Sequence, residues 1–206
     1  MKGLILKDIL IIKNNIRFLL ISILLYLFIG YSNNADVTYF IPFMTFMLII
    51  STFSYDDYNK WHAYAITIPN GRKKVVRAKY ISLIILTLLS SVIGLILSYI
   101  LGTFNQEILS SICGSFLAIC ILASILFPII FKYGSEKGRI SILIIFLGLT
   151  AIISVLSNVI KIKPLELIKV LIFLEKYGMV LIPLISVIII FISYKVSEHI
   201  YMKKEF

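Results

Sequence analysis

Apolar residues occur along this chain in long blocks, separated by short polar intervals. Six such blocks run over residues 18–31, 37–55, 80–101, 108–131, 140–160 and 177–196. A helix needs about 20 apolar residues to cross the hydrocarbon core of a bilayer, and most of the blocks approach that length. The pattern therefore predicts an all-α fold: a polytopic membrane protein with six transmembrane helices in a single domain over residues 1–206.

Residues 4–17, ahead of the first block, form an amphipathic segment. On a helix, Leu4, Ile9 and Ile16 fall near one face, whereas Lys7 and Asp8 fall on the other. A helix of this kind lies in the membrane interface and turns its lysines toward the lipid head groups. We therefore predict an N-terminal interfacial helix over residues 4–17.

Residues 161–176, between the fifth and sixth blocks, combine lysines with a run of leucine, isoleucine and valine. This mixture predicts an external segment of short helices that lie in the outer membrane interface or re-enter from it. The alternative is a seventh, partial span, which would reverse the last span and place the basic tail outside.

The net charge of +10 becomes informative once the positions of the basic residues are considered. In a soluble protein such a charge would suggest a nucleic-acid partner. Here the intervals after the first and third blocks carry no Lys or Arg, whereas the N-terminal segment, the intervals after the second and fourth blocks, and the tail carry most of the 20. This bias predicts that both termini face the cytoplasm and that the basic residues contact membrane lipid, not nucleic acid.

The middle of every predicted span lacks Asp, Glu, Lys, Arg and His. Carriers driven by protons or ions place such groups at membrane depth, so the pattern disfavours an ion-coupled antiporter and a channel with charged rings. The second span instead carries aromatic and methionine side chains, which could line an adaptable apolar translocation path. The candidates are Phe43, Met44, Phe46 and Met47. Plain contact with lipid or with another helix is the alternative for this stripe.

The longest polar interval, residues 54–80, holds the acid pair Asp56-Asp57, the only tryptophan and one of the two histidines. These residues raise the question of a metal site, but the other acids are scattered, and His62 and His199 have no partner at ligand spacing. A two-metal or paired-carboxylate mechanism would have too few ligands. The chain also lacks the G-x-x-x-x-G-K-[ST] phosphate-binding loop. We therefore expect neither a catalytic site, nor a metal site, nor ATP hydrolysis by this chain.

The same interval has the pattern of a short helix, a turn and a second helix. Asp56 and Asp57 would lie in the first turn, where acids suit the positive end of the helix dipole, and Trp61 and Tyr64 would share one face. The Pro-Asn-Gly sequence at 69–71 predicts a tight turn, after which basic residues lead into the third span. These residue types favour either a protein interface or a helical hairpin on lipid. The pattern leaves both open.

Two stretches carry a resemblance to a known family. They are MKGLILKD at the N-terminus and YDDYNKWHAYAITIPNGRKKVVRAKY at residues 55–80. Together with the layout of six spans, they resemble the small permease subunits of type-2 ATP-binding-cassette exporters. The resemblance is nearest to bacterial exporters of amphipathic, cytolytic peptides such as phenol-soluble modulins. The family architecture also includes short re-entrant helices between spans five and six.

The resemblance implies a docking segment and its partner. In the family, the cytoplasmic segment between spans two and three, here residues 56–79, is a coupling helix that docks into a separate ATPase subunit. Carried over, the docking residues are Asp56, Lys60, Trp61, Tyr64, Arg72 and Lys73. ATP and Mg would bind to that ATPase, so no cofactor is expected in this chain. A second copy of the permease or a homologous permease would complete the transporter.

The resemblance also implies a location and a cargo. It suggests a permease of the bacterial plasma membrane that exports amphipathic or hydrophobic molecules, among them peptides. Two other functions fit an apolar chain with many spans. One is a membrane-embedded immunity protein that sequesters an antimicrobial peptide without turnover, and the other is a lipid-modifying membrane enzyme.

Overall fold

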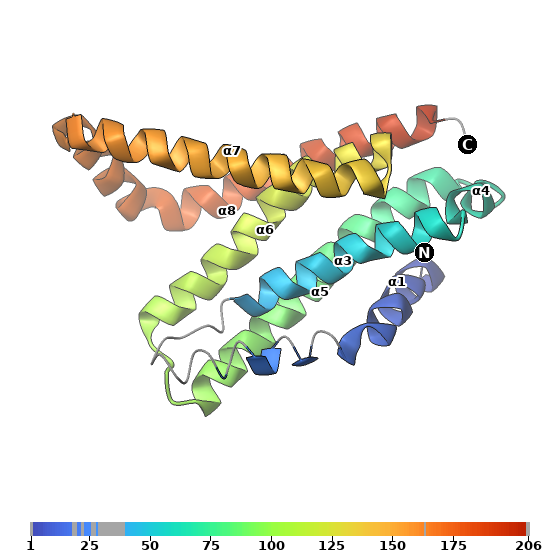
Figure 1. The fold of residues 1–206 in the computed structure, drawn as a ribbon, viewed down its shortest axis with the longest axis horizontal. Coiled ribbons are helices and arrows are strands. Elements are labelled where there is room, and N and C mark those ends of the chain that lie inside the picture. Colours follow the sequence, from blue (N-terminus) through green and yellow to red (C-terminus); the bar gives the residue numbers. More distant parts are fainter. Residues whose placement is uncertain are drawn as a thin grey trace.

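The computed structural model describes residues 2–17, 20–21, 23–25, 28, 40–162 and 164–204; at residues 2, 66, 146, 149, 152–153, 155–162 and 164–182 it describes the backbone alone. Within these ranges the backbone forms helices and the turns between them, which confirms the predicted all-α class. The helices are α1 (Lys2–Asn14), α3 (Phe40–Tyr58), α4 (Trp61–Ile66), α5 (Gly71–Ile100), α6 (Gln106–Tyr133), α7 (Ser135–Ile162) and α8 (Pro164–Lys203) (Figure 1).

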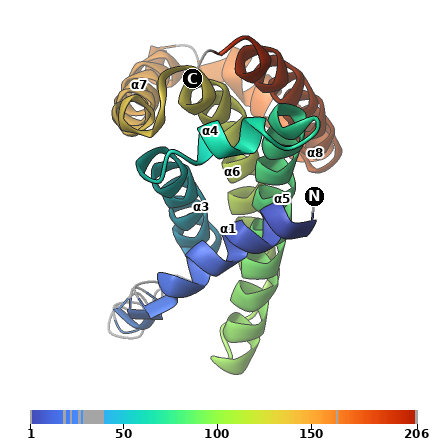
Figure 2. The same cartoon turned by 90° about the vertical axis from the view of Figure 1, so that its right-hand side faces the viewer.

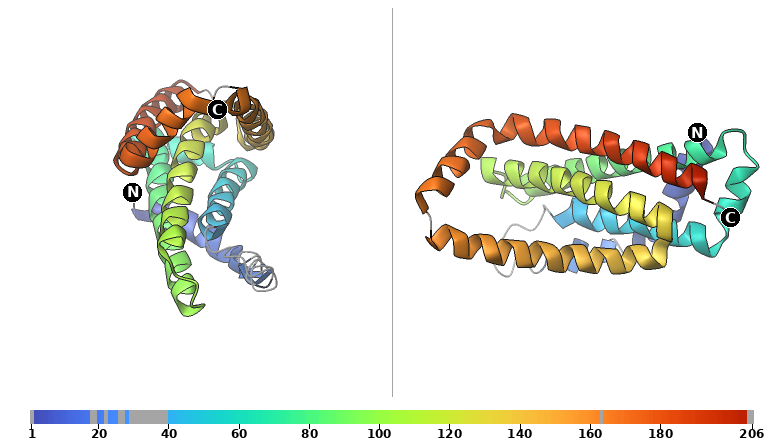
Figure 3. Two further views of the ribbon diagram at one scale, coloured as in Figure 1. Left: turned by 90° about the vertical axis from the view of Figure 1, so that its left-hand side faces the viewer. Right: turned by 90° about the horizontal axis from the view of Figure 1, so that it is seen from above.

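The helices form an elongated bundle, and α4 lies across one end of it (Figures 1 and 2). α6 packs most extensively against α8, while α5 contacts α3, α6 and α8. α1 crosses the outside of α3 and α5 (Figure 2). The start of α1 and the end of α8 lie at the same end of the bundle as α4 (Figure 3), as an even number of membrane crossings requires. That this end faces the cytoplasm stays a prediction.

Three segments of the described helices are long and apolar enough to cross a membrane: Gly71–Ile100, Gln106–Tyr133 and Pro183–Lys203. α5 and α6 contain the third and fourth predicted spans. α5 extends the third span toward α4, and its added turns carry the basic residues that follow Gly71. The first predicted span falls partly outside the described residues, so the number of six spans stays a prediction.

Residues 164–176 of the predicted external segment are continuous with the last span, whereas residues 161 and 162 end α7. α8 runs as one helix from Pro164 to Lys203, through the predicted start of the sixth span at residue 177. No proline occurs between Pro164 and Pro183, so nothing in this stretch forces the helix to end. Pro183 lies inside α8 and removes one backbone hydrogen bond, and the helix bends along its course (Figure 3). Contact of residues 161–176 with the outer interface stays a prediction.

An aromatic cluster fills the interior of the bundle near α4. The ring centroid of Phe53 lies 5.0 Å from that of Phe127 and 5.3 Å from that of Phe131. The centroid of Phe131 in turn lies 5.2 Å from that of Tyr201. Each pair meets edge to face, an arrangement that the ring quadrupoles favour. Because the rings come from α3, α6 and α8, they fix three helices against one another at the end where the candidate site lies.

Candidate functional site

The short helix α4 and the turns on either side of it project from the end of the bundle, and we call these residues, 59–70, the knob. The residues that border α4 and α5, Lys60 and Asn70, have φ angles of 50° and 56°. Both angles lie in the left-handed region, which asparagine enters readily and lysine only at an energetic cost. The backbone reversal at Lys60 separates α3 from α4.

The turn after α4 brings two helices into close contact. The Gly71 N–H donates to the carbonyl oxygen of Ile68 at 2.8 Å, which confirms the predicted tight turn. A Cβ at Gly71 would lie 1.8 Å from the carbonyl oxygen of Ala65 in α4. Only glycine permits so close an approach. The knob is therefore fixed directly against the start of α5.

Asp56 and Asp57 end α3, so the prediction that they begin the knob helix is wrong. α3 continues without interruption from Phe40 to Tyr58. Acids in a last helical turn face the negative end of the dipole, which is unfavourable by itself. Both carboxylates have partners on other helices that compensate for this. The helix dipole favours acids at the start of a helix, but here contacts with residues on other helices stabilise the two acids at the end of α3.

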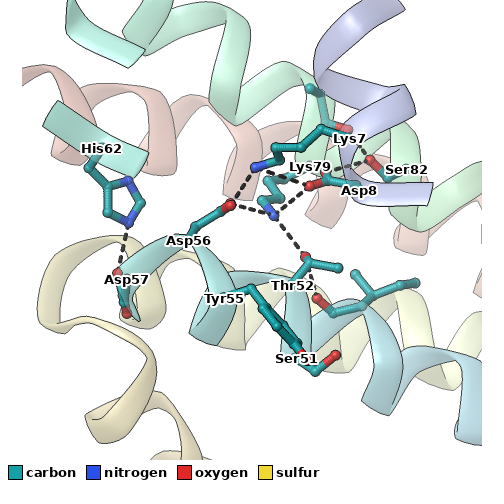
Figure 4. Close-up of polar contacts among 12 residues, drawn as sticks. Lys7, Asp8, Ser51, Thr52, Tyr55, Asp56, Asp57, His62, Lys79 and Ser82 are labelled. Atoms are coloured by element: carbon teal, nitrogen blue, oxygen red, sulfur yellow. Dashed lines mark hydrogen bonds and ion pairs between the residues drawn. The ribbon is translucent and has the colours of Figure 1, made fainter. Parts of the chain in front are cut away.

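Four charged side chains from three helices meet at the base of the knob, and we call them the base cluster: Lys7 and Asp8 of α1, Asp56 of α3 and Lys79 of α5 (Figure 4). Lys79 Nζ lies 2.9 Å from Asp8 Oδ1 and 2.8 Å from Asp56 Oδ2. Lys7 Nζ pairs with Asp56 Oδ1 and lies 3.4 Å from Asp8 Oδ1. Each ammonium group therefore faces both carboxylates, and the four charges cancel.

The base cluster is shielded from water and supplied with further hydrogen bonds. The side chains of Asp8 and Lys79 are each 3% exposed, and that of Asp56 is 2% exposed. Lys79 Nζ donates to Thr52 Oγ1 at 2.7 Å, and Ser82 Oγ donates to Asp8 Oδ2 at 3.2 Å. A buried ion costs several kcal/mol unless it is paired and hydrogen-bonded, and these contacts meet that condition. The cluster thus joins α1 to α3 and α5.

α1 turns Lys7 and Asp8 toward the bundle, so the prediction that Lys7 faces the lipid head groups is wrong. Leu4, Asp8 and Ile12, which follow one another at one-turn spacing, are all buried. The side chain of Lys7 is 21% exposed, and its ammonium lies 4.7 Å from the centroid of the Trp61 ring. The carboxylates on this side of α1 give the ammonium closer partners than the solvent does.

Asp57 points to a second set of contacts, away from the base cluster. One carboxylate oxygen lies 2.7 Å from His62 Nε2 (Figure 4), and the other accepts from the backbone N–H of Ser135 at 2.6 Å. His62 Nδ1 lies 2.7 Å from the hydroxyl of Tyr201. Burial by itself would raise the pKa of Asp57, but the contacts with His62 and Ser135 outweigh it and lower the pKa to about 2. These contacts connect α3 with the knob, the start of α7 and the end of α8.

The predicted docking residues differ in their access to solvent. Tyr64 is 61% exposed, and Lys60 and Lys73 are also exposed. Trp61 is partly buried, and its ring centroid lies 5.1 Å from that of Tyr64. Asp56 is 2% exposed, so its carboxylate does not reach the surface of the knob.

Two basic residues at the start of α5 contact the end of α8. Arg72 donates to the backbone carbonyl of Met202, and Lys73 Nζ lies 3.7 Å from a carboxylate oxygen of Glu198.

Tyr58, which the sequence pattern did not single out, is 87% exposed beside the knob. The accessible aromatic surface is therefore wider than the predicted one.

The four candidates for a translocation path lie on different sides of α3. Phe46 is 1% exposed within the hydrophobic core, and Phe43 packs against that core. Met44 is partly exposed and Met47 is 37% exposed. A role of these residues in translocation stays a prediction.

Among the described residues, no group of three or more His, Cys, Asp or Glu side chains is placed to hold a metal ion. A cavity of about 390 Å³ lies between the end of α3 and the connection from α6 to α7. Its walls include Asp57 and Tyr58, together with Arg139, which donates to Ser54 Oγ at 3.3 Å. The cavity is open to solvent beside the knob.

The sequence pattern missed the residues that hold the knob in place. Lys7 and Asp8 were assigned to a lipid-facing surface and Lys79 to membrane orientation, yet all three belong to the base cluster. One signal was present: Asp8 lies at one-turn spacing between Leu4 and Ile12, and an acid on an apolar helix face needs a partner. No comparable signal marked Tyr201, because its partner His62 is 139 positions away.

The described helices thus form a bundle that presents a short helix with the exposed aromatic residue Tyr64 at one end. A family model described as "ABC-2 family transporter protein" matches residues 3–202. The chain belongs to this family, whose members are membrane components of transporters and pair with an ATP-binding-cassette ATPase. The protein is accordingly an integral membrane protein and a transporter component. Comparisons with curated proteins and with solved structures gave no significant match.

Proposed function

We propose that this protein is the permease subunit of an ATP-driven exporter and that a separate cytoplasmic ATPase docks on the knob. The family supplies the class of transporter, and the geometry of the knob supports the docking assignment. The knob exposes Tyr64 and Lys60 and places the Trp61 ring beside that of Tyr64. Tyrosine and tryptophan are enriched at the hot spots of protein interfaces.

The proposed docking surface differs in part from the one that the family resemblance implies. We place Lys60, Trp61, Tyr64 and Lys73 at its centre because they lie on or near the exposed side of the knob. Asp56 is left out because it is buried. Arg72 and the carbonyl oxygen that it contacts form the edge of the surface toward α8.

In the proposed cycle, the role of this chain is to transmit movement. ATP and Mg bind to the ATPase, ATP binding brings two ATPase subunits together, and the two attached permeases shift as rigid bodies. The second permease is an identical or homologous chain in the bacterial plasma membrane. The rigid attachment of the knob supports this role, because α4 is in backbone contact with α5 and cannot yield without moving it.

We propose amphipathic or hydrophobic molecules as the cargo, with peptides such as phenol-soluble modulins or antimicrobial peptides as candidates. The described spans support an apolar cargo because their hydroxyl groups bond mainly within their own helices. Thr87 donates to the Leu83 carbonyl oxygen and Ser124 to that of Cys120, each at 2.7 Å. Hydroxyl groups that are already bonded leave an apolar surface, with few polar groups to bind a small ion.

The docking assignment is tested by the affinity of the purified permease for its candidate ATPase. The double variant Trp61→Ala with Tyr64→Ala should lose about 30-fold or more, because a central hot spot contributes about 2 kcal/mol or more. The control replaces Tyr99 and Phe104 by alanine. Their exposed rings also form a pair, 6.4 Å apart, at the far end of α5, and this variant should bind normally. Unchanged affinity in the knob variant would place docking elsewhere.

The cargo is tested in inside-out vesicles that contain the permease and the ATPase. We expect ATP-dependent accumulation of an amphipathic helical peptide, and its loss in the knob variant. Stoichiometric binding of the peptide without ATP-dependent accumulation would contradict export and favour sequestration by an immunity protein. Chemical modification of added lipid would favour an enzyme.

A further inference from the structure

α1 lies outside the bundle, yet two of its neighbouring residues reach three other helices. Lys7 pairs with Asp56 at the end of α3 (Figure 4), and its ammonium lies 4.7 Å from the ring of Trp61 in the knob. Asp8 pairs with Lys79 of α5 at 2.9 Å. The proposed docking aromatic is therefore in direct contact with α1.

The other face of α1 is exposed and mostly apolar, and it also carries Lys13 and Arg17. Leu6 is 57% exposed, Leu10 50%, Ile16 44% and Ile9 39%. A helix with such a face is stable when that face lies in the membrane interface. α1 thus lies on the outside of α3 and α5 at the base of the knob, with Lys7 and Asp8 turned inward and its exposed face free for lipid.

We infer that Lys7 and Asp8 are positioning residues that lock α1 and the knob into one mechanical unit, so that the ATPase moves α1 along the membrane surface when it displaces the knob. The inference rests on the proposed docking function. Separating the base cluster would leave charges unpaired in the interior, which is strongly unfavourable. Moving α1 together with the knob avoids that penalty. Among the described helices, α1 packs against α3 and α5 and contacts α4 through Lys7 and Trp61, and the remaining described helices do not hold it back.

A balanced double variant tests this lock without destroying the fold. Lys7→Met with Asp56→Asn removes one charge of each sign and leaves the pair of Asp8 and Lys79 intact. Neutral replacement of a whole buried ion pair is often tolerated, whereas removal of one partner is not. The control, Glu136→Gln with Lys195→Met, makes the same change at exposed positions of α7 and α8, which do not contact α1.

The functional measurement is the amount of peptide transported per ATP hydrolysed in reconstituted vesicles. In the balanced variant the ratio should fall about 5-fold or more, the lower range of coupling between sites, while affinity for the ATPase stays near normal. The control variant should keep the wild-type ratio. A wild-type ratio in the balanced variant would overturn the inference. So would a loss of affinity as large as that of the Trp61 and Tyr64 variant, because the cluster would then act on docking alone.

A structural measurement tests the lock separately from docking. Spin labels at Leu6 and Ala63, both exposed, report the distance between α1 and the knob once Cys113 and Cys120 are replaced. In the purified permease alone, this distance should be narrowly distributed in the wild type and broad in the balanced variant. Equal widths would overturn the lock even if docking is correct. With the ATPase trapped on ATP, the wild-type distance should stay unchanged, and a shift would also overturn it.

Discussion

Asp56 and Asp57 are neighbours in sequence but lie in opposite environments. Asp56 is 2% exposed and faces two lysine ammonium groups, whereas the side chain of Asp57 is 31% exposed and contacts His62 and a backbone N–H. Successive side chains on an α-helix point about 100° apart. Asp56 therefore anchors the end of α3 to α1 and α5, whereas Asp57 anchors it to the knob and α7 and, through His62, to α8. The acid pair, which raised the question of a metal site in the sequence, thus makes two separate sets of structural contacts. We call them the Asp56 branch and the Asp57 branch.

The largest expected effect is the loss of stability in a variant of Asp56, compared with the same change at Asp57. Asp56→Asn leaves two lysines with one carboxylate in the interior and should lower stability by about 3 kcal/mol. Asp57→Asn removes hydrogen bonds in a half-exposed setting and should cost about 1 kcal/mol. Thermal denaturation in detergent measures both variants. Adding Lys7→Met to Asp56→Asn should restore most of the loss, and equal losses in the two single variants would contradict the difference in environment.

A smaller effect is expected at Gly71, where α4 approaches the start of α5. Gly71→Ala places a methyl group against the carbonyl oxygen of Ala65 and should push α4 away from α5. Overpacking of this kind costs about 2 kcal/mol, and the docking affinity should fall with stability. Gly114→Ala is the matched control, because a Cβ there meets nothing within 4 Å. Its stability should be unchanged or slightly higher. A loss as large as that of Gly71→Ala would mean that the close approach of Gly71 to Ala65 is not the cause of the effect.

The smallest effect concerns acid and the branch through Asp57. The pKa of Asp57 is lowered from 3.8 to about 2, so its contribution is fully present above about pH 4 and is lost as the pH falls through 2. The stability difference between the wild type and Asp57→Asn should therefore shrink between pH 4 and pH 2. Denaturation of both proteins across this range measures it. A difference that stays constant with pH would mean that Asp57 does not contribute through its charge.

The fold could be predicted where the information is local. Long apolar runs define α5 and α6, and the Pro-Asn-Gly sequence defines the turn before Gly71. The end of α3 could not be predicted in this way. The groups that allow two acids in its last turn are Lys7, 49 positions from Asp56, and His62 and Ser135, the latter 78 positions from Asp57.

In the candidate site, too, some features follow from local sequence and others depend on contacts between residues that are distant in sequence. The exposure of Tyr64 and Lys60 follows from their position in a polar interval between two spans, and the structure agrees. The burial of Asp56 depends on how α1 packs, which no periodicity in residues 54–80 reports. An amphipathic pattern shows that α1 has two faces but not which residues meet protein, and Asp8 proved to be buried together with Leu4 and Ile12.

The neutrality of the base cluster has an electrical consequence. Two ammonium groups and two carboxylates sum to zero, and they meet where α1, α3 and α5 join at the base of the knob. A single charge that moves through the whole membrane field exchanges about 2.3 kcal/mol per 100 mV with it. A neutral cluster exchanges almost none, in whichever direction it moves. The base cluster therefore adds no voltage dependence to the proposed step, and its coupling of α1 should be the same in polarised and depolarised membranes.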